Sequence, residues 1–138
     1  MRDTMETKMN QKLSLLREEI LRISGVNPKK CMRCGKCTGT CPAYHEMEYH
    51  PHEVVDFVDR GEIVPLLDAP SLARCLSCMA CTERCPRGVE PSKLVEAVCT
   101  VRQRLRGGYT FSPDDIPARL DEDMPQQLLV SAMRKYRK

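Results

Sequence analysis

A repeated cysteine pattern constrains this chain more than any other feature of its sequence. Residues 31–42 and 75–86 read CMRCGKCTGTCP and CLSCMACTERCP, and both copies have the spacing C-x2-C-x2-C-x3-C-P. The second copy begins 44 residues after the first. Four thiols placed so closely suit a loop that curls around one inorganic cluster, so the repeat predicts two 4Fe–4S clusters.

The spacing within each copy also predicts which cysteines share a cluster. The first three cysteines of such a run reach irons of one cluster, whereas the fourth, followed by proline, turns away to the other cluster. We therefore expect crossed ligation by two sets of four cysteines. The first set is Cys31, Cys34, Cys37 and Cys85, and the second set is Cys75, Cys78, Cys81 and Cys41.

Zinc and disulfides are the competing interpretations of these cysteines. Structural zinc prefers C-x2-C pairs that lie a dozen or more residues apart, and three cysteines at three-residue intervals fit that pattern poorly. Residues 1–23 have scattered charges and no continuous apolar core, so they do not read as a secretory signal. We therefore expect a cytoplasmic protein in a reducing compartment, where metal binding is favoured over disulfides.

Four further residues could bind a metal but are not needed as ligands, because cysteines supply all eight positions. Cys99 has no companion at ligand spacing, and we expect it to be a buried free thiol. His45, His50 and His52 follow the first motif, and we expect them to be surface or capping residues.

Charge and hydropathy exclude two classes of partner. The formal net charge is +3, but residues 31–99 carry seven Lys and Arg against ten Asp and Glu. Two oxidised clusters held by thiolates would each add about −2, which brings the whole chain near −1. Without a basic patch interleaved with aromatic residues, we expect no nucleic-acid partner. No segment approaches the roughly 18 to 20 continuous apolar residues of a membrane helix, so we expect no membrane span.

Helical periodicity dominates the chain, and no alternating segment of strand length occurs. One apolar stripe predicts a first helix that ends near Gly25, and its members are Met5, Met9, Leu13, Leu16, Ile20 and Ile23. This stripe fits either the chain's own core or a docking contact with a partner. Further helices are predicted over 52–61 and from Pro91 to Gly107, with short turns or helices at 63–67 and 71–74.

These elements divide the chain into three expected segments. They are an N-terminal amphipathic helix over 1–27, a dicluster domain over 28–106, and a proline-broken tail over 107–138. The tail ends in an amphipathic helix predicted over 126–136. This helix suits packing either on its own domain or on a neighbouring chain.

The two motifs and the continuation CTERCPRGVEPSKLVEAV resemble the C-type subunit of the soluble heterodisulfide reductase family over roughly residues 28–106. The resemblance implies a mostly α fold, a helical two-cluster domain in place of the compact βαβ ferredoxin. It also implies a non-catalytic electron-transfer subunit of an oxidoreductase complex in anaerobic metabolism. Its implied partners are a flavin-bearing subunit and a disulfide-reducing subunit with adjacent-cysteine motifs.

Two absences from the sequence agree with an electron-carrying role. The chain contains no adjacent pair of cysteines and no glycine-rich dinucleotide fingerprint, so disulfide chemistry and flavin binding are expected on the partners. The expected mechanism is outer-sphere transfer of one electron per cluster. Two alternatives share this chemistry: the iron-sulfur wire of a different dehydrogenase or sulfur-oxidising complex, and a free ferredoxin.

Overall fold

The computed structural model describes residues 2–107, 123 and 125–127, with side chains described from residue 7 onward. Every regular element within these ranges is helical, which confirms the mostly α fold class. The chain divides into two compact units, Met1–Gly108 and Tyr109–Lys138. The helix predicted over 126–136 belongs to the second unit and, apart from its first two residues, lies outside the described residues. The predicted division at residues 27 and 106 stays a prediction.

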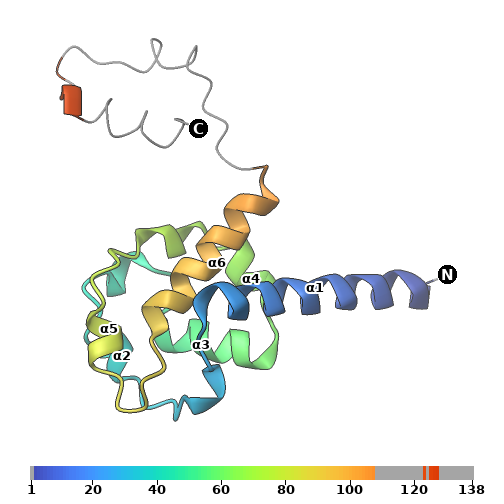
Figure 1. Cartoon of the computed structure of the whole chain (residues 1–138), viewed down its shortest axis with the longest axis horizontal. Helices are drawn as coiled ribbons and strands as arrows, with labels where there is room; N and C mark the ends of the chain where they lie inside the picture. Colours follow the sequence, from blue (N-terminus) through green and yellow to red (C-terminus); the bar gives the residue numbers. More distant parts are fainter. Residues whose placement is uncertain (1, 108–122, 124, 128–138) are drawn as a thin grey trace. The chain divides into compact units, whose positions relative to one another are not determined.

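The first helix, α1, spans Arg2–Ser24 and follows the predicted apolar stripe. Ile20 is fully buried, and Leu13 and Leu16 are partly buried against the core. Met9, one turn earlier in the stripe, is 58% exposed. Figure 1 shows the N-terminal half of α1 extending away from the other helices of its unit. Among its described side chains, the stripe therefore packs on the chain's own core along the C-terminal half of α1 only.

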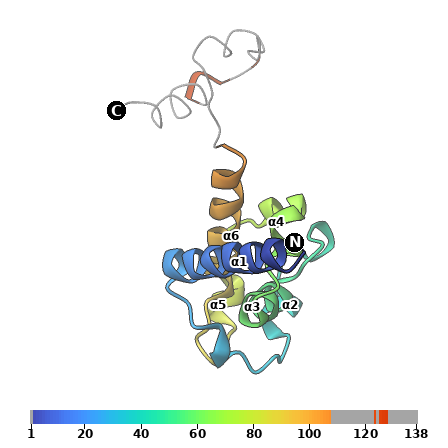
Figure 2. The same cartoon turned by 90° about the vertical axis from the view of Figure 1, so that its right-hand side faces the viewer.

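The centre of the first unit is α6, Pro91–Leu105, which contacts α1, α3 (Pro51–Arg60) and α4 (Val64–Asp68). Figures 1 and 2 show α1 running across α6. Both α3 and α6 begin with proline, whose fixed φ and missing N–H suit the first helical position. The largest fully buried side chains around this centre are Ile20, Val54, Val55, Val58, Ile63, Leu66, Leu72, Leu94, Val95, Val98 and Val101.

The short turns or helices predicted over 63–67 and 71–74 correspond to α4 and η3 (Pro70–Arg74), and further short helices that were not predicted lie between the long ones. These further helices are the 3-10 helices η1 (Pro28–Lys30) and η2 (Tyr44–Glu46), and the single-turn α-helices α2 (Lys36–Gly39) and α5 (Ala80–Glu83). The last two lie within the cysteine motifs and contact each other. The two motifs are therefore side by side in the folded unit although they are distant in sequence.

A hydrogen-bonded contact joins α1 to the helix that follows the first motif. Helix α3 ends at Gly61, whose φ of 80° is a left-handed conformation that costs glycine nothing. Arg17 of α1 donates from Nε to the carbonyl oxygen of Val58 at 2.7 Å and from Nη2 to that of Asp59 at 3.1 Å. These carbonyls lie in the last turn of α3, where the helix has no N–H four residues further along to donate to them. Arg17 therefore fixes α3, and with it one wall of the site, against α1.

Candidate metal centres

The two cysteine motifs share one backbone conformation. Arg33 and Gly35 have φ values of 56° and 72°, and the equivalent Ser77 and Met79 have values of 51° and 60°. Residues other than glycine rarely adopt this left-handed region, so the surrounding loop must hold three of these four positions there. Left-handed residues alternating with ordinary ones turn successive backbone N–H groups toward the inside of a loop, where they can donate to an anion. The sequence reasoning missed this conformation, and its only signal was glycine at one of the four positions.

The first cavity gathers thiols from both motifs. Cys31, Cys34 and Cys37 of the first motif line it together with Cys85 of the second. Its volume is about 340 Å³, part of which is open to solvent. Cys37 is buried at its inner end, whereas Cys34 is exposed at its mouth.

The second cavity repeats this arrangement with the motifs exchanged. Cys75, Cys78 and Cys81 of the second motif line it together with Cys41 of the first. Its volume is about 350 Å³, part of which is open to solvent. The side chains are thus grouped as in the crossed ligand sets, whose role as ligands stays a prediction.

The walls of both cavities come from the same two long helices. Val55 of α3 lines the first cavity and Val95 of α6 lines the second. The proline that begins each helix lines the opposite cavity, Pro91 the first and Pro51 the second. Because α3 and α6 pack on each other and each contacts both cavities, the two sites are neighbours with shared apolar walls.

A hydrogen-bonded threonine follows the buried cysteine of each cavity. Thr38 Oγ1 lies 2.6 Å from His52 Nδ1, and Thr82 Oγ1 lies 2.6 Å from Ser92 Oγ. His52 lines the first cavity and Ser92 lines the second. Ser92 also donates from Oγ to the sulfur of Met79 at 2.9 Å. The two sites therefore have equivalent hydrogen-bonding positions occupied by different side chains.

Burial changes the acidity of the inner thiols. It raises the pKa of Cys37 to about 11, and it also raises the pKa values of Cys81 and Cys41. Hydrogen bonds from Thr38 to Cys37 and from Ser92 to Cys81 act in the opposite direction, because they stabilise the thiolate. Metal groups bind thiolates, so loading these cavities releases protons and is favoured by alkaline pH.

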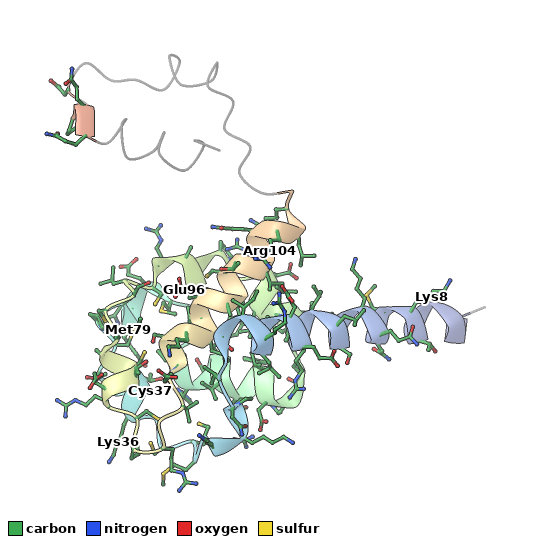
Figure 3. All side chains as sticks on the ribbon, viewed as in Figure 1. Lys8, Lys36, Cys37, Met79, Glu96 and Arg104 are labelled. Carbon is green, nitrogen blue, oxygen red and sulfur yellow. The ribbon has the colours of Figure 1, made fainter. Side chains whose placement is uncertain are left out.

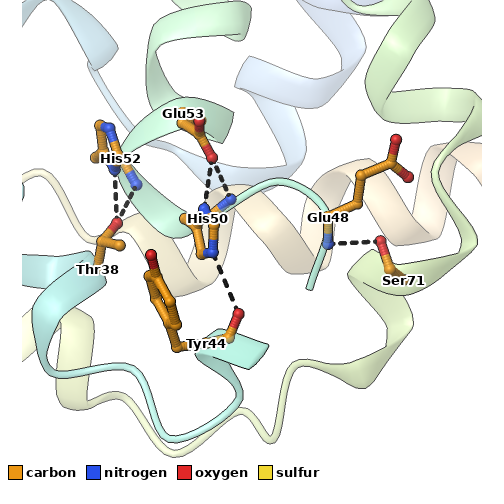
Figure 4. A network of polar contacts seen from close by, with 7 residues as sticks. All are labelled: Thr38, Tyr44, Glu48, His50, His52, Glu53 and Ser71. Atoms are coloured by element: carbon orange, nitrogen blue, oxygen red, sulfur yellow. Dashed lines mark hydrogen bonds and ion pairs between the residues drawn. The ribbon is translucent and has the colours of Figure 1, made fainter. Parts of the chain in front are cut away.

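The histidines after the first motif have different roles. His50 precedes α3 and donates its backbone N–H to Glu53 Oε2 at 2.8 Å, while its Nδ1 lies 2.8 Å from the same oxygen (Figure 4). Its ring stacks on Tyr44 with centroids 4.3 Å apart. This confirms the predicted capping role for His50. His52 instead bonds to Thr38 and lines the first cavity, a position that sequence reasoning missed.

The ninth cysteine stands apart from both sets. Cys99 lies on α6 and is a free, half-buried thiol packed against the core, not a fully buried one. Burial raises its pKa. Among the described residues, it is not part of the lining of either cavity.

The donor chemistry of the cavities fits a thiolate-bound cluster. Within the described ranges, no three Cys, His, Asp or Glu side chains converge on a point that a single metal ion would occupy. A zinc ion needs its ligands around one point at about 2.0 to 2.3 Å, whereas a cubane presents its four irons at separate corners. Four thiols around an apolar space therefore match a 4Fe–4S cluster better than zinc.

Comparison with known proteins agrees with this geometry. Residues 30–90, which include both motifs, match the family described as the 4Fe–4S dicluster domain. The protein therefore carries two 4Fe–4S clusters and has an iron-sulfur electron-transfer role. Within the part of the chain that the structure describes, no helix is long and apolar enough to cross a membrane.

Three curated proteins are similar in sequence to this chain. The chain is 33% identical over 96 residues to the C-type subunit of the H(2):CoB-CoM heterodisulfide,ferredoxin reductase of Methanothermobacter thermautotrophicus, covering 70% of this chain and 50% of the relative. It is 34% identical over 93 residues to the C-type iron-sulfur subunit of the CoB--CoM heterodisulfide reductase of Methanopyrus kandleri, covering 67% and 44%. It is 32% identical over 92 residues to the C-type subunit of the Ferredoxin:CoB-CoM heterodisulfide reductase of Methanosarcina mazei, covering 66% and 55%. The chain thus spans about half the length of the curated relatives it matches.

Proposed function

Because residues 30–90 match the 4Fe–4S dicluster domain and the chain is similar in sequence to C-type subunits of heterodisulfide reductases, we propose that it relays single electrons between a flavin-bearing subunit and a disulfide-reducing subunit of one complex. The observation that carries the proposal is the pair of adjoining cavities, each lined by four thiols drawn from both motifs. A path through two neighbouring sites suits a protein that accepts electrons from one partner and delivers them to another.

In this proposal each cluster has four cysteine ligands. Cys31, Cys34, Cys37 and Cys85 hold the first, and Cys75, Cys78, Cys81 and Cys41 hold the second. Each cluster supplies the exchange of one electron between its 2+ and 1+ core states.

The chain's own residues tune and insulate this exchange. Val55, Val95 and the prolines that begin α3 and α6 exclude water from the inner faces of the cavities. Thr38 and Ser92 donate backbone hydrogen bonds to the sulfurs of Cys37 and Cys81, which stabilises added negative charge.

Two further observations support a subunit over a freely diffusing ferredoxin. Helix α1 presents Met9 of its extended N-terminal half at 58% exposure and Leu15 of its C-terminal half at 65% exposure, on a helix that a small diffusing carrier does not need. The sequence has no adjacent cysteines, so the disulfide chemistry falls to a partner. We place this partner and the flavin subunit together with this chain in a cytoplasmic complex.

Anaerobic purification tests the cofactor side of the proposal. The protein should be brown, with roughly eight irons and eight sulfides per chain, and dithionite should produce a paramagnetic signal. A colourless protein that binds zinc would contradict it.

Isolation of the native complex tests the partners. We expect a flavin subunit and a subunit with adjacent-cysteine motifs to purify together with this chain. Reduction of the flavin should then generate the signal of this chain's clusters. A complex with a substrate-oxidising flavin domain and no adjacent-cysteine subunit would support the alternative dehydrogenase, and a chain without partners would support the free ferredoxin.

A further inference from the structure

The two sites are built alike but differ sharply in charge. Residues 29–37, around the first three cysteines of the first motif, contain four cations and no carboxylate. The equivalent residues 73–81 contain Arg74 and no other charged residue. The four cations are Lys29, Lys30, Arg33 and Lys36.

The fold adds a fifth cation to the first site. Arg87 follows the second motif in sequence, yet it lines the first cavity and donates from Nε to the carbonyl oxygen of Lys30 at 3.3 Å. All five cations are exposed, and they flank the exposed Cys34. We call this group of five the basic rim: Lys29, Lys30, Arg33, Lys36 and Arg87. Figure 3 shows Lys36 of the rim beside Cys37, at the end of the unit away from the N-terminus of α1.

Different side chains surround the mouth of the second cavity. Leu76 and Met79 line it and are 67% and 41% exposed. At the first site, Arg33 is the one rim cation that pairs with a carboxylate of the described residues, that of Asp56, which also binds Arg60. The rim thus keeps most of its positive charge for an external group.

Cluster binding gives the two sites charges of opposite sign. An oxidised 4Fe–4S cluster with four thiolates has a net charge of about −2. Five rim cations exceed that charge even with Asp56 included, whereas Arg74 alone does not offset the second cluster. The mouth of the first site is therefore positive and that of the second site negative, over a range set by a Debye length of about 10 Å at 0.1 M salt.

We propose that the basic rim is the docking surface for an acidic protein that exchanges electrons with the first cluster. The inference rests on the proposed function, because it requires that the clusters carry electrons to partners. Opposite charges around two redox centres speed their encounter and orient them for transfer. A nucleic acid fits the rim less well, because residues 29–37 contain no aromatic side chain on which a base could stack.

Two charge-reversed variants with equal net charge test the docking surface. Lys30→Glu/Lys36→Glu reverses two rim cations, and Lys12→Glu/Arg106→Glu reverses two exposed cations away from the rim and from both motifs. The probe is an acidic flavodoxin, titrated against the loaded protein by thermophoresis at low and physiological salt. We expect wild-type binding that weakens as salt rises, a roughly tenfold weaker Kd for the rim variant at low salt, and a change below about twofold for the control.

Three results would overturn the docking surface. One is an equal loss of flavodoxin binding in both variants, because net charge alone would then explain it. Another is no loss in the rim variant. The third is rim-dependent binding of poly(U) RNA that is tighter than that of flavodoxin at the same salt. Iron content and the dithionite-induced signal are measured on every sample, so a failure of the electron-carrier role in the wild type is recognised separately.

Discussion

Pairwise replacement of cysteines tests the crossed ligation. Crossed ligation and ligation within each motif make opposite predictions about which of two double variants keeps more iron. Cys34 and Cys85 line the same cavity although they belong to different motifs. Cys34 and Cys41 belong to the same motif but line different cavities. If the clusters occupy these cavities, Cys34→Ala/Cys85→Ala damages one site, and Cys34→Ala/Cys41→Ala damages both.

The magnitudes follow from the number of thiols left in each cavity. The intact protein should hold roughly eight irons per chain, and Cys34→Ala should leave roughly four in the undamaged second site. Adding Cys85→Ala should change this content little, since it acts on a site already lost. Adding Cys41→Ala should bring the iron content toward zero, because no cavity then keeps four thiols. In the background of Cys34→Ala, the loss of iron caused by Cys41→Ala should therefore be much larger than that caused by Cys85→Ala, a comparison made as in a double-mutant cycle.

The assay is anaerobic reconstitution followed by iron and sulfide analysis and spin counting after dithionite reduction. Cys99→Ala is the matched control, because Cys99 lines neither cavity among the described residues, and it should keep both clusters. The reverse pattern would refute the reasoning: about four irons in Cys34→Ala/Cys41→Ala and almost none in Cys34→Ala/Cys85→Ala would mean that each motif binds its own cluster.

Substitutions of Glu53 and Gly61, with Gly39 as a control position, test the structure around the sites. Burial by itself would raise the pKa of Glu53, but hydrogen bonds from the backbone N–H and ring of His50 outweigh it and lower that pKa below its usual range. Glu53 therefore stabilises the fold above its ordinary pKa and loses this effect as the pH falls through the lowered value. The difference in unfolding free energy between wild type and Glu53→Gln should therefore shrink in acid. A difference that stays constant with pH in guanidinium titrations would contradict this. Gly61→Ala should cost about 1 kcal/mol at its φ of 80°, read as a lower Tm, whereas Gly39→Ala in ordinary helical geometry should cost nothing.

Local chemistry made the helix boundaries predictable from sequence. Gly61 ends α3 and Gly25 follows the end of α1, both with positive φ, while Pro51 and Pro91 begin α3 and α6. These residues act through their own backbone preferences, which depend little on distant contacts. The buried faces of α3 and α6 likewise follow from apolar periodicity.

Other features depend on contacts between distant segments. Met79 has the left-handed conformation that Gly35 has in the first motif, because the loop holds it there and not because of its own preference. His52 lines the first cavity through the position of α3, although its sequence neighbours suggest a capping residue. The apolar stripe of α1 continues to Met9, but only its C-terminal half meets α6 and the core.

The sequence by itself determined the cofactor class and the helical architecture. Cysteine spacing determines which metal group a short loop can bind, and the period of the apolar residues determines which helix faces are apolar. Only the tertiary structure decided that His52 lines the first cavity and that Arg87 belongs to the site of the opposite motif. The physical reason is that both depend on the packing of α3 against α6, a long-range contact that no local preference specifies.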